Sequence, residues 1–124
     1  MKTFRFRDFQ VYKDSRKFRK DVTSTLKTFP TTERYRLVDQ IHRSCLSVLP
    51  NIAEGSAKRS DADFARFLEM SICSLNECVA GFDAAYDDAL VTEEIRLDVE
   101  KAAELLVKQL GGFIKSLRLK KVDS

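Results

Sequence analysis

Residues 11–30 read VYKDSRKFRKDVTSTLKTFP, and apolar or small side chains recur among them every three or four positions. This spacing places those side chains on one face of an α-helix, with basic residues on the other faces. Pro30 ends the helix, because proline donates no backbone hydrogen bond and the residue before a proline disfavours the α conformation. The stretch therefore predicts an amphipathic helix with one buried stripe, formed by Val11, Ser15, Phe18, Val22, Leu26 and Phe29.

The same period recurs in three further stretches. Thr31 or Thr32 caps a second helix, and Gly55 closes it in the left-handed conformation, which glycine adopts at no steric cost. Ser60 caps a third helix, and Thr92 caps a fourth. The expected buried stripes of these helices are, in chain order, Val38, Ile41, Cys45, Val48 and Ile52; Phe64, Phe67, Ser71, Leu75, Cys78, Phe82 and Tyr86; and Ile95, Val99, Ala102, Leu106, Leu110, Phe113 and Leu117.

Chain length and loop size decide the architecture. A chain of 124 residues is long enough for one hydrophobic core, and short loops make neighbouring helices antiparallel. We therefore predict a single all-α domain over residues 1–124, folded as an antiparallel up-down-up-down four-helix bundle. We further expect a basic and aromatic N-terminal arm at residues 1–8 and a flexible tail at residues 119–124.

Some residues conflict with ideal helices. Pro50 should kink the second helix, because it removes one helical hydrogen bond at a cost of about 3 kcal/mol. Gly111 and Gly112 weaken the fourth helix by about 1 kcal/mol each relative to alanine, and they permit a close helix contact or a bend. Glu54 lies at the negative end of the second helix dipole, so it needs a positive partner, and Arg59 is the nearest candidate.

Charge is distributed unevenly along the chain. The net charge is only +3, but residues 1–20 hold eight basic side chains against two acidic ones, whereas residues 61–100 hold two against eleven. One interpretation is solvated helix faces that complement one another, and the other is a basic surface for phosphate backbones. Asp83, Asp87 and Asp88, at the end of the third helix, should need basic partners from another helix or another subunit.

The chain offers little for catalysis or metal binding. A dimetal carboxylate site in a helical bundle takes two Glu-x-x-His motifs, but His42 is the only histidine, and Asp39 takes the glutamate position before it. The lone histidine also disfavours Ser-His-Asp and Cys-His catalysis. Cys45 and Cys78 lie on core stripes as small hydrophobic residues, and the cysteine spacing fits neither a disulfide framework nor a zinc site. We expect no catalytic residue, no metal and no cofactor.

The sequence shows neither a membrane span nor a secretion signal. No apolar run reaches the roughly 20 residues that cross a bilayer, and the N-terminus lacks an apolar signal core. We therefore expect a cytoplasmic protein with no membrane contact. A second apolar set beside the core stripes would stay partly exposed in a monomer, which predicts a homo-oligomer. This set comprises Tyr35, Leu46, Met70, Ile72 and Val79.

A distinctive motif spans the turn between the second and third helices. Residues 47–55 read SVLPNIAEG, and residues 59–68 read RSDADFARFL. They closely resemble the signature of a bacterial family of four-helix-bundle proteins, first recognised as products of open reading frames in intervening sequences of 23S ribosomal RNA genes. The similarity covers nearly the whole chain, with Leu49 and Lys58 as conservative departures. The motif positions are Ser47, Pro50, Asn51, Glu54, Gly55 and Arg59.

This resemblance implies an antiparallel four-helix bundle, commonly assembled as a ring-shaped homopentamer, and no established enzymatic activity. The chain is also similar, at the level of the fold only, to the accessory protein of diversity-generating retroelements. That protein is a basic pentameric bundle that binds nucleic acid and a reverse transcriptase. The polar residues of the motif, together with Ser60, form either a clasp that fixes the helix turn or a surface for a ligand.

Two functional hypotheses follow. An oligomeric scaffold would bind RNA or another nucleic acid, because Lys and Arg neutralise phosphates and exposed aromatic rings stack on unpaired bases. Its candidate residues are Arg5, Arg7, Lys13, Arg16, Lys17, Lys20, Lys58 and Arg59. Phe4, Phe6 and Phe9 would stack on bases, or else cover the open end of the bundle. Alternatively, the oligomer presents a surface to a protein partner and binds no nucleic acid, and its acidic third helix pairs with the basic first helix between subunits.

Overall fold

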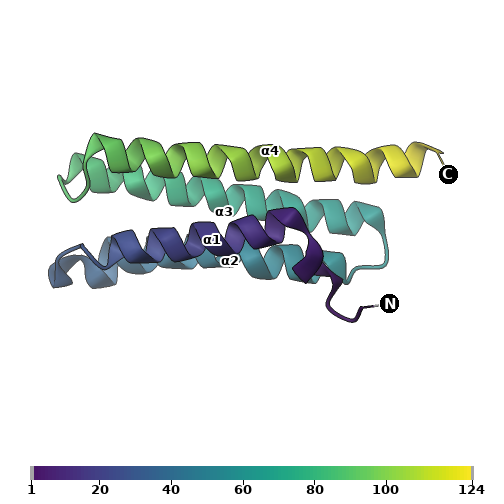
Figure 1. Ribbon diagram of the computed structural model, residues 1–124, viewed down its shortest axis with the longest axis horizontal. Coiled ribbons are helices and arrows are strands. Elements are labelled where there is room, and N and C mark those ends of the chain that lie inside the picture. Colours follow the sequence, from purple (N-terminus) through teal and green to yellow (C-terminus); the bar gives the residue numbers. More distant parts are fainter. Residues whose placement is uncertain (1, 124) are drawn as a thin grey trace.

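The computed structural model describes residues 2–123, apart from the side chains of residues 33–35 and 120–123. It contains four α-helices, α1 (Gln10–Leu26), α2 (Asp39–Ser56), α3 (Asp61–Asp87) and α4 (Glu93–Asp123). Consecutive helices run in opposite directions along one long axis, so the chain forms an elongated antiparallel bundle (Figure 1). This arrangement confirms the predicted four-helix bundle.

Short helical turns precede α1 and α2. The segment η1 (Arg5–Asp8) is a 3₁₀ turn in the N-terminal arm, and η2 (Thr31–Glu33) and η3 (Arg34–Val38) are a 3₁₀ and a π-helical turn. The predicted start of the second α-helix at Thr31 or Thr32 is therefore wrong. The backbone becomes helical there, but α2 starts only at Asp39. The apolar period alone does not distinguish α, 3₁₀ and π turns.

Two of the predicted caps are confirmed. The backbone N–H of Asp63 donates to the Ser60 hydroxyl at 3.1 Å, and the N–H of Ile95 donates to the Thr92 hydroxyl at 3.2 Å. Each bond satisfies a donor in the first turn of its helix, where the backbone has no helical partner. These caps fix where α3 and α4 begin.

The core lies along the axis of the bundle, where the predicted stripes meet. All six stripe residues of the first helical stretch are buried, and Phe29 packs edge-on against Phe82 of α3 with ring centroids 6.5 Å apart. Tyr86 was predicted to be buried, and this is wrong, because it is 41% exposed and Ala85 takes the buried position. The Tyr86 ring lies against the Arg96 guanidinium, 5.2 Å from the ring centroid. In α4, three predicted stripe residues, Ile95, Ala102 and Phe113, are only half-buried. After Ala102 and Phe113 the next residue, Ala103 or Ile114, is buried instead.

Gly55 and Gly81 bring α2 and α3 close together. A Cβ built on Gly55 would lie 2.8 Å from the Cβ of Phe67, and one built on Gly81 would lie 2.5 Å from Cγ1 of Ile41. Gly55 lies inside α2, and no glycine among the described residues has a positive φ. The predicted left-handed cap at Gly55 is therefore wrong. Glycine is needed there because the side of α3 leaves no room for a side chain.

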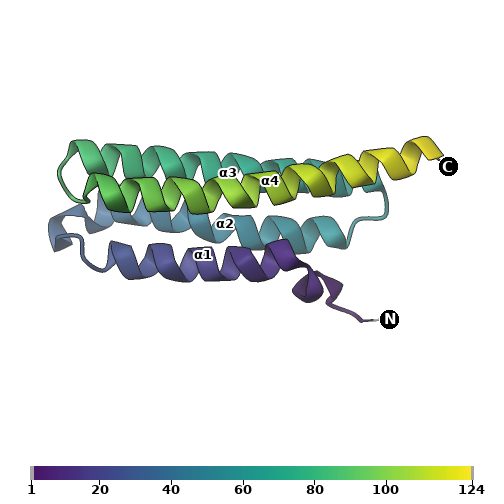
Figure 2. The ribbon, with the colours of Figure 1, turned by 45° about the horizontal axis from the view of Figure 1, so that its top comes forward.

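Gly111 and Gly112 neither break α4 nor make a close contact with another helix in the described part of the chain. A Cβ built on either would meet no atom within 4 Å, and α4 runs unbroken through both positions. Beyond them α4 extends past the ends of its neighbours (Figure 2). The flexible tail at residues 119–124 stays a prediction, because α4 runs to Asp123 and Ser124 lies outside the described residues.

The second apolar set is partly exposed, as predicted. Leu46 and Met70 are each 42% exposed, whereas Ile72 and Val79 are half-buried and pack against the core. The side chain of Tyr35 lies outside the described part of the structure. None of the described helices is both long enough and apolar enough to cross a lipid bilayer.

Candidate nucleic-acid interface

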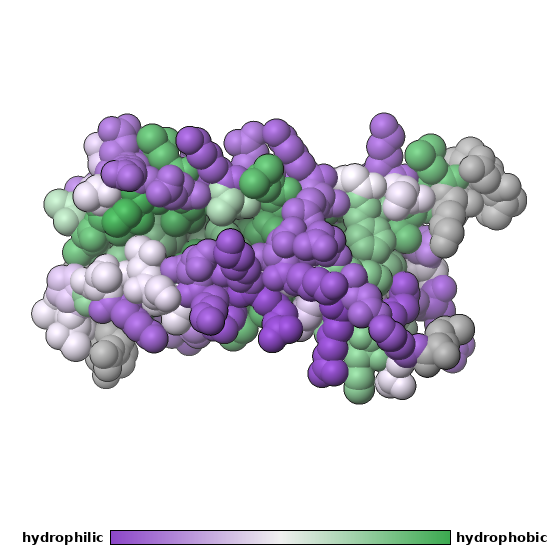
Figure 3. Space-filling model, in the orientation of Figure 1, coloured by the Kyte–Doolittle hydropathy of each residue, from purple (hydrophilic) through white to green (hydrophobic). Residues whose placement is uncertain are grey.

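The outer face of α1 carries a basic stripe. Lys13, Arg16, Lys17 and Lys20 are exposed and lie opposite the buried side of the helix, which follows from 3.6 residues per turn. None of the four lies within ion-pair distance of a carboxylate among the described residues. Hydrophilic side chains cover this face, whereas hydrophobic surface shows in the strip between α1 and α4 (Figure 3).

The acidic residues of α1 lie on its α4 side, where Lys17 lines a cavity together with Asp14 and Asp21 but forms no ion pair with either. Asp14 turns towards α4, where it accepts hydrogen bonds from Nε2 of Gln10 at 2.9 Å and from Nε2 of Gln109 at 3.0 Å. Asp21 lines a cavity in the same α1–α4 seam. The positive potential of Lys13, Arg16 and Lys20 is therefore left to solvent or to a ligand.

Other cations of the chain do pair with carboxylates. Ion pairs within 4 Å link Lys2 to Asp8, Arg43 to Asp39, Arg66 to Asp63, Lys108 to Glu104 and Arg118 to Glu69. Arg96 of α4 reaches Asp83 of α3 at 3.4 Å, which supplies the inter-helix partner expected for that carboxylate. Among the described residues, α1 differs from the other helices in that its unpaired charges are mainly basic, whereas those of α3 are acidic.

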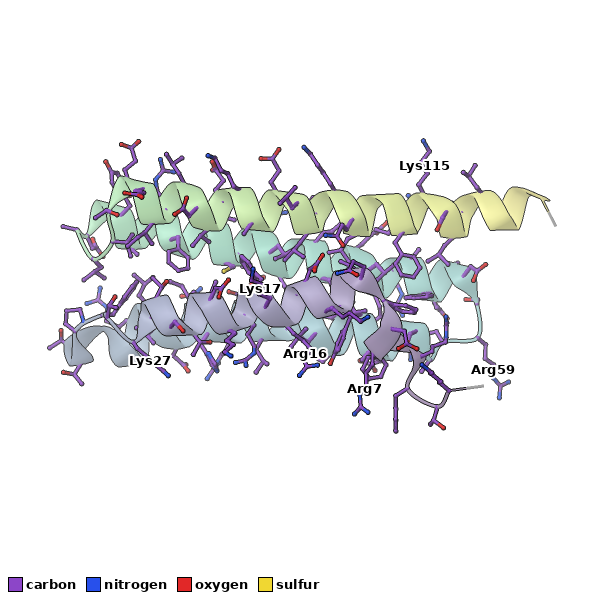
Figure 4. All side chains as sticks on the ribbon, in the orientation of Figure 1. Arg7, Arg16, Lys17, Lys27, Arg59 and Lys115 are labelled. Atoms are coloured by element: carbon purple, nitrogen blue, oxygen red, sulfur yellow. The ribbon has the colours of Figure 1, made fainter. Side chains whose placement is uncertain are left out.

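The two arginines of the N-terminal arm differ in what they contact. The Arg5 guanidinium lies over the rings of Phe9 at 5.5 Å and Phe64 at 5.6 Å, and it donates to the Ser56 carbonyl at 2.9 Å. A cation is favoured there, because the carbonyls at the end of α2 carry partial negative charge. Arg7 lies over the ring of Phe4 and points away from the bundle (Figure 4). Arg5 therefore holds the arm in place, and Arg7 is the freer cation.

The aromatic residues of the arm are also divided. Phe9 is half-buried and packs against Phe113 with centroids 5.2 Å apart, so it covers the open end of the bundle. Phe6 packs edge-on against Tyr12 at 4.9 Å. Phe4 is 55% exposed. Only Phe4 therefore offers a ring face broadly accessible to a partner.

Lys58 and Arg59 lie in the loop between α2 and α3. Lys58 Nζ lies 5.0 Å from the centroid of the Phe67 ring, and Arg59 points away from the protein (Figure 4). The predicted pairing of Arg59 with Glu54 is wrong, because neither residue lies within ion-pair distance of an oppositely charged described residue. The loop carries Arg59 away from the helix end, where Arg5 binds a carbonyl in its place.

Two residues of the SVLPNIAEG motif, Ser47 and Val48, form hydrogen bonds with α3. The hydroxyls of Ser47 and Ser74 are 2.6 Å apart, and Ser71 donates to the Val48 carbonyl at 3.0 Å. Asn51 Nδ2 donates to the Ser47 carbonyl at 2.9 Å. α2 runs through Pro50, which is exposed on the outer face. Ser47 and Asn51 thus have hydrogen-bond partners, as the clasp interpretation requires, but Glu54 and Arg59 form no ion pair with described residues at the turn.

The buried cysteines are poor nucleophiles. Burial raises the pKa of the Cys45 thiol to about 11, against a smaller opposing effect of Arg19. Burial, followed by the nearby Cys45, raises the pKa of Cys78 to about 12. Both thiols are therefore protonated at neutral pH. Among the described side chains, no three His, Cys, Asp or Glu residues cluster closely enough to hold a metal ion.

A cavity near the basic stripe was not anticipated from the sequence. It has a volume of about 240 Å³ and lies between the end of α1 and the start of α2, with Thr23, Lys27 and His42 among its lining residues. Lys27 was missed as a candidate residue. The available signal was its position on the helix, seven residues after Lys20 and hence on nearly the same face.

Known proteins match both the sequence and the fold. The profile of the 23S rRNA-intervening sequence protein family matches residues 7–112. The fold is similar to the crystal structure of a protein of unknown function from the S23 ribosomal protein family of Bacteroides thetaiotaomicron VPI-5482, with a TM-score of 0.78 and 24% sequence identity. The similarity covers 85% of this chain and 95% of that one. A comparison with curated proteins finds no match.

Proposed function

Because the chain belongs to the family of 23S rRNA-intervening sequence proteins, we propose that it is a non-enzymatic subunit of a cytoplasmic homo-oligomer that binds RNA. The outer face of α1 carries this proposal. Its four cations are exposed and lack carboxylate partners among the described residues, although acidic side chains are abundant elsewhere on the molecule.

The α1 face suits a phosphate backbone. Lys13 and Lys20 are separated by about 10 Å along the helix axis, so the stripe spans more than one phosphate. Binding of this kind releases counterions and weakens with salt. If the four cations each neutralise one phosphate of a single strand, affinity should fall about 50-fold between 50 and 200 mM salt.

A fluorescence titration tests the proposal. The wild-type chain is titrated with labelled single-stranded RNA and with an RNA hairpin at both salt concentrations. A four-residue variant, called here the stripe variant, replaces the α1 cations with glutamine at Lys13, Arg16, Lys17 and Lys20. A control variant with the same net charge replaces paired cations at Arg43, Arg66, Lys108 and Arg118.

This titration has three informative outcomes. We expect strong binding at low salt for the wild type and the control variant, and a loss of at least tenfold for the stripe variant. Absence of binding at low salt would eliminate the proposal. Equal losses in the two variants would mean that net charge, and not the α1 face, determines binding.

The proposed oligomer rests on exposed apolar surface. Leu46 and Met70 are nearly half exposed on α2 and α3, and association would remove such side chains from water. The family resemblance favours five subunits in a ring. Multi-angle light scattering should give a mass near five times 14.2 kDa. A mass near that of one chain contradicts the proposal.

A protein partner is the second candidate, and the seam between α1 and α4 favours it. This seam contains cavities of about 190 and 210 Å³, both lined by Phe18 and Ala102, and Leu105 at its edge is 62% exposed. An amphipathic helix fits such a seam. A pull-down with and without nuclease separates the two functions. A partner that contacts the protein directly should still be captured after nuclease treatment, whereas one held through RNA should be lost.

A further inference from the structure

The cavity between α1 and α2 has apolar walls and several polar side chains among its lining residues. Leu26, Phe29 and Pro30 from the end of α1 and the following loop, with Val38 before α2, supply apolar wall. Leu26 and Phe29 are buried, so this part of the wall is fixed by the core. Its volume of about 240 Å³ lies below the range of pockets for drug-sized ligands and suits one planar ring system.

Thr23 lines this cavity, but its hydroxyl oxygen has almost no surface open to it. Its Oγ1 is buried and has no hydrogen-bond partner among the described residues. The next two residues behave differently, since Ser24 donates to the carbonyl of Lys20 at 3.1 Å and Thr25 donates to that of Asp21 at 3.2 Å. The helix therefore uses the hydroxyls of Ser24 and Thr25, whereas that of Thr23 is enclosed by protein atoms, and the cavity must bind a ligand through its other polar groups.

Additional polar groups face the cavity from other walls. His42 of α2 lines it, and a neutral imidazole offers one donor and one acceptor. Thr31, which carries a hydroxyl group, also lines it. Planar apolar faces with donors and acceptors around the edge are the chemistry of a nucleobase, and proteins recognise unpaired bases through these features.

Cations connect the cavity to the basic stripe. Lys27 lines the cavity, and Lys20 and Arg16 lie on the same side of α1, about 10 and 16 Å away along the helix axis. Arg16 and Lys27 point in the same direction from α1 (Figure 4). Neither is paired with a carboxylate in the described part of the chain.

From this juxtaposition we infer that the α1–α2 cavity takes one unpaired nucleobase of a single strand whose phosphates lie along the α1 face. The inference rests on the proposed function and sharpens it. A base within a duplex is stacked and paired, so a duplex cannot fill the cavity without opening. The protein therefore prefers single-stranded RNA, or an RNA loop, to a fully paired helix.

His42 provides a direct test, because it is the only histidine in the chain and its imidazole C–H protons give unique NMR signals. The full-length chain is titrated with a six-nucleotide RNA, with its DNA counterpart, and with a blunt RNA duplex. The His42 signals should shift in a saturable manner with the single strands, and the duplex should leave them unchanged. Single strands that bind without moving these signals would overturn the inference.

Two variants separate the cavity from the stripe. Val38→Trp fills the cavity without replacing an α1 cation, and Thr23→Val, which removes a hydroxyl closed off from the cavity, is its control. Val38→Trp should weaken single-strand binding by about tenfold, which is the usual effect of losing contacts to one base, and Thr23→Val should leave it unchanged. The salt dependence should stay as in the wild type.

The outcomes distinguish this inference from the proposed function. Unchanged affinity in Val38→Trp, with circular dichroism showing a folded chain, would overturn the inference about the cavity while leaving α1 as the RNA-binding face. Absence of any RNA binding by the wild type would overturn both. Equal shifts of the His42 signals with RNA and DNA would support the cavity and show that it does not read the 2′-hydroxyl.

Discussion

Replacing Gly55 with alanine tests the packing on which the fold depends. The added Cβ would lie 2.8 Å from the Cβ of Phe67, 3.0 Å from Cδ1 of Phe64 and 3.3 Å from the Phe64 carbonyl oxygen. Two of these atoms are fixed to the backbone of α3, so a rotamer change cannot relieve the contact. α2 and α3 must separate locally, and the seam around the motif must loosen.

The expected magnitude is the difference between two opposing effects. Forcing an extra methyl group into a packed contact costs about 1 to 3 kcal/mol. Alanine is favoured over glycine inside a helix by about 1 kcal/mol. The free energy of unfolding should therefore fall by up to about 2 kcal/mol, which corresponds to a melting temperature lower by up to roughly 8 °C.

Urea unfolding followed by circular dichroism at 222 nm measures this change. Gly112→Ala is the matched control, because Gly112 lies in a helix and a Cβ built there meets no atom within 4 Å. The control should raise the free energy of unfolding by up to about 1 kcal/mol. If Gly55→Ala stabilises the chain to the same extent, the close contact between α2 and α3 does not exist as described.

Other predictions concern the serine seam and the thiols. Ser74→Ala removes the 2.6 Å contact with Ser47 and should lower the free energy of unfolding by about 1 kcal/mol in the same urea assay. In the native protein at pH 8, a thiol reagent should modify exposed Cys73 rapidly, whereas Cys45 and Cys78 should react only after unfolding, as thiol counting will show. In the unfolded chain the thiols of Cys45 and Cys78 ionise with a pKa of 9.0, whereas in the folded chain their pKa values are raised to about 11 and about 12. Between pH 9 and 11 both thiols therefore stay protonated in the folded chain and lose their protons in the unfolded chain. The free energy of unfolding, measured with urea at a series of pH values, should therefore not depend on these two thiols below pH 9. It should fall as the pH rises from 9 towards 11, because the unfolded chain then releases protons that the folded chain keeps.

Local periodicity was sufficient to predict the fold. The stripe from Val11 to Phe29 is fully buried, since a helix whose apolar residues share one face has one stable way to remove them from water. Tyr86 continues the same period but ends up exposed, because a large amphipathic ring near a helix end can lie against a cation such as Arg96. The spacing of apolar residues does not show where along a helix the buried core ends.

Contacts between distant residues could not be predicted in this way. Gly55 fits a left-handed cap and a close helix contact equally well in sequence, and only the position of Phe67 decides between them. The guanidinium of Arg5 is a group that binds phosphates, yet in the structure it donates to the carbonyl of Ser56, 51 residues away. The α1–α2 cavity likewise depends on how the end of α1 meets His42.

The salt dependence of RNA binding tests the central claim most directly. For a single strand, log K plotted against log salt should have a slope near −2.8 if the four cations of the α1 stripe each neutralise one phosphate. The stripe variant should lose most of this slope, and the control variant at Arg43, Arg66, Lys108 and Arg118 should retain it. Equal slopes for wild type and stripe variant would contradict the account, because the α1 face would then make no phosphate contacts.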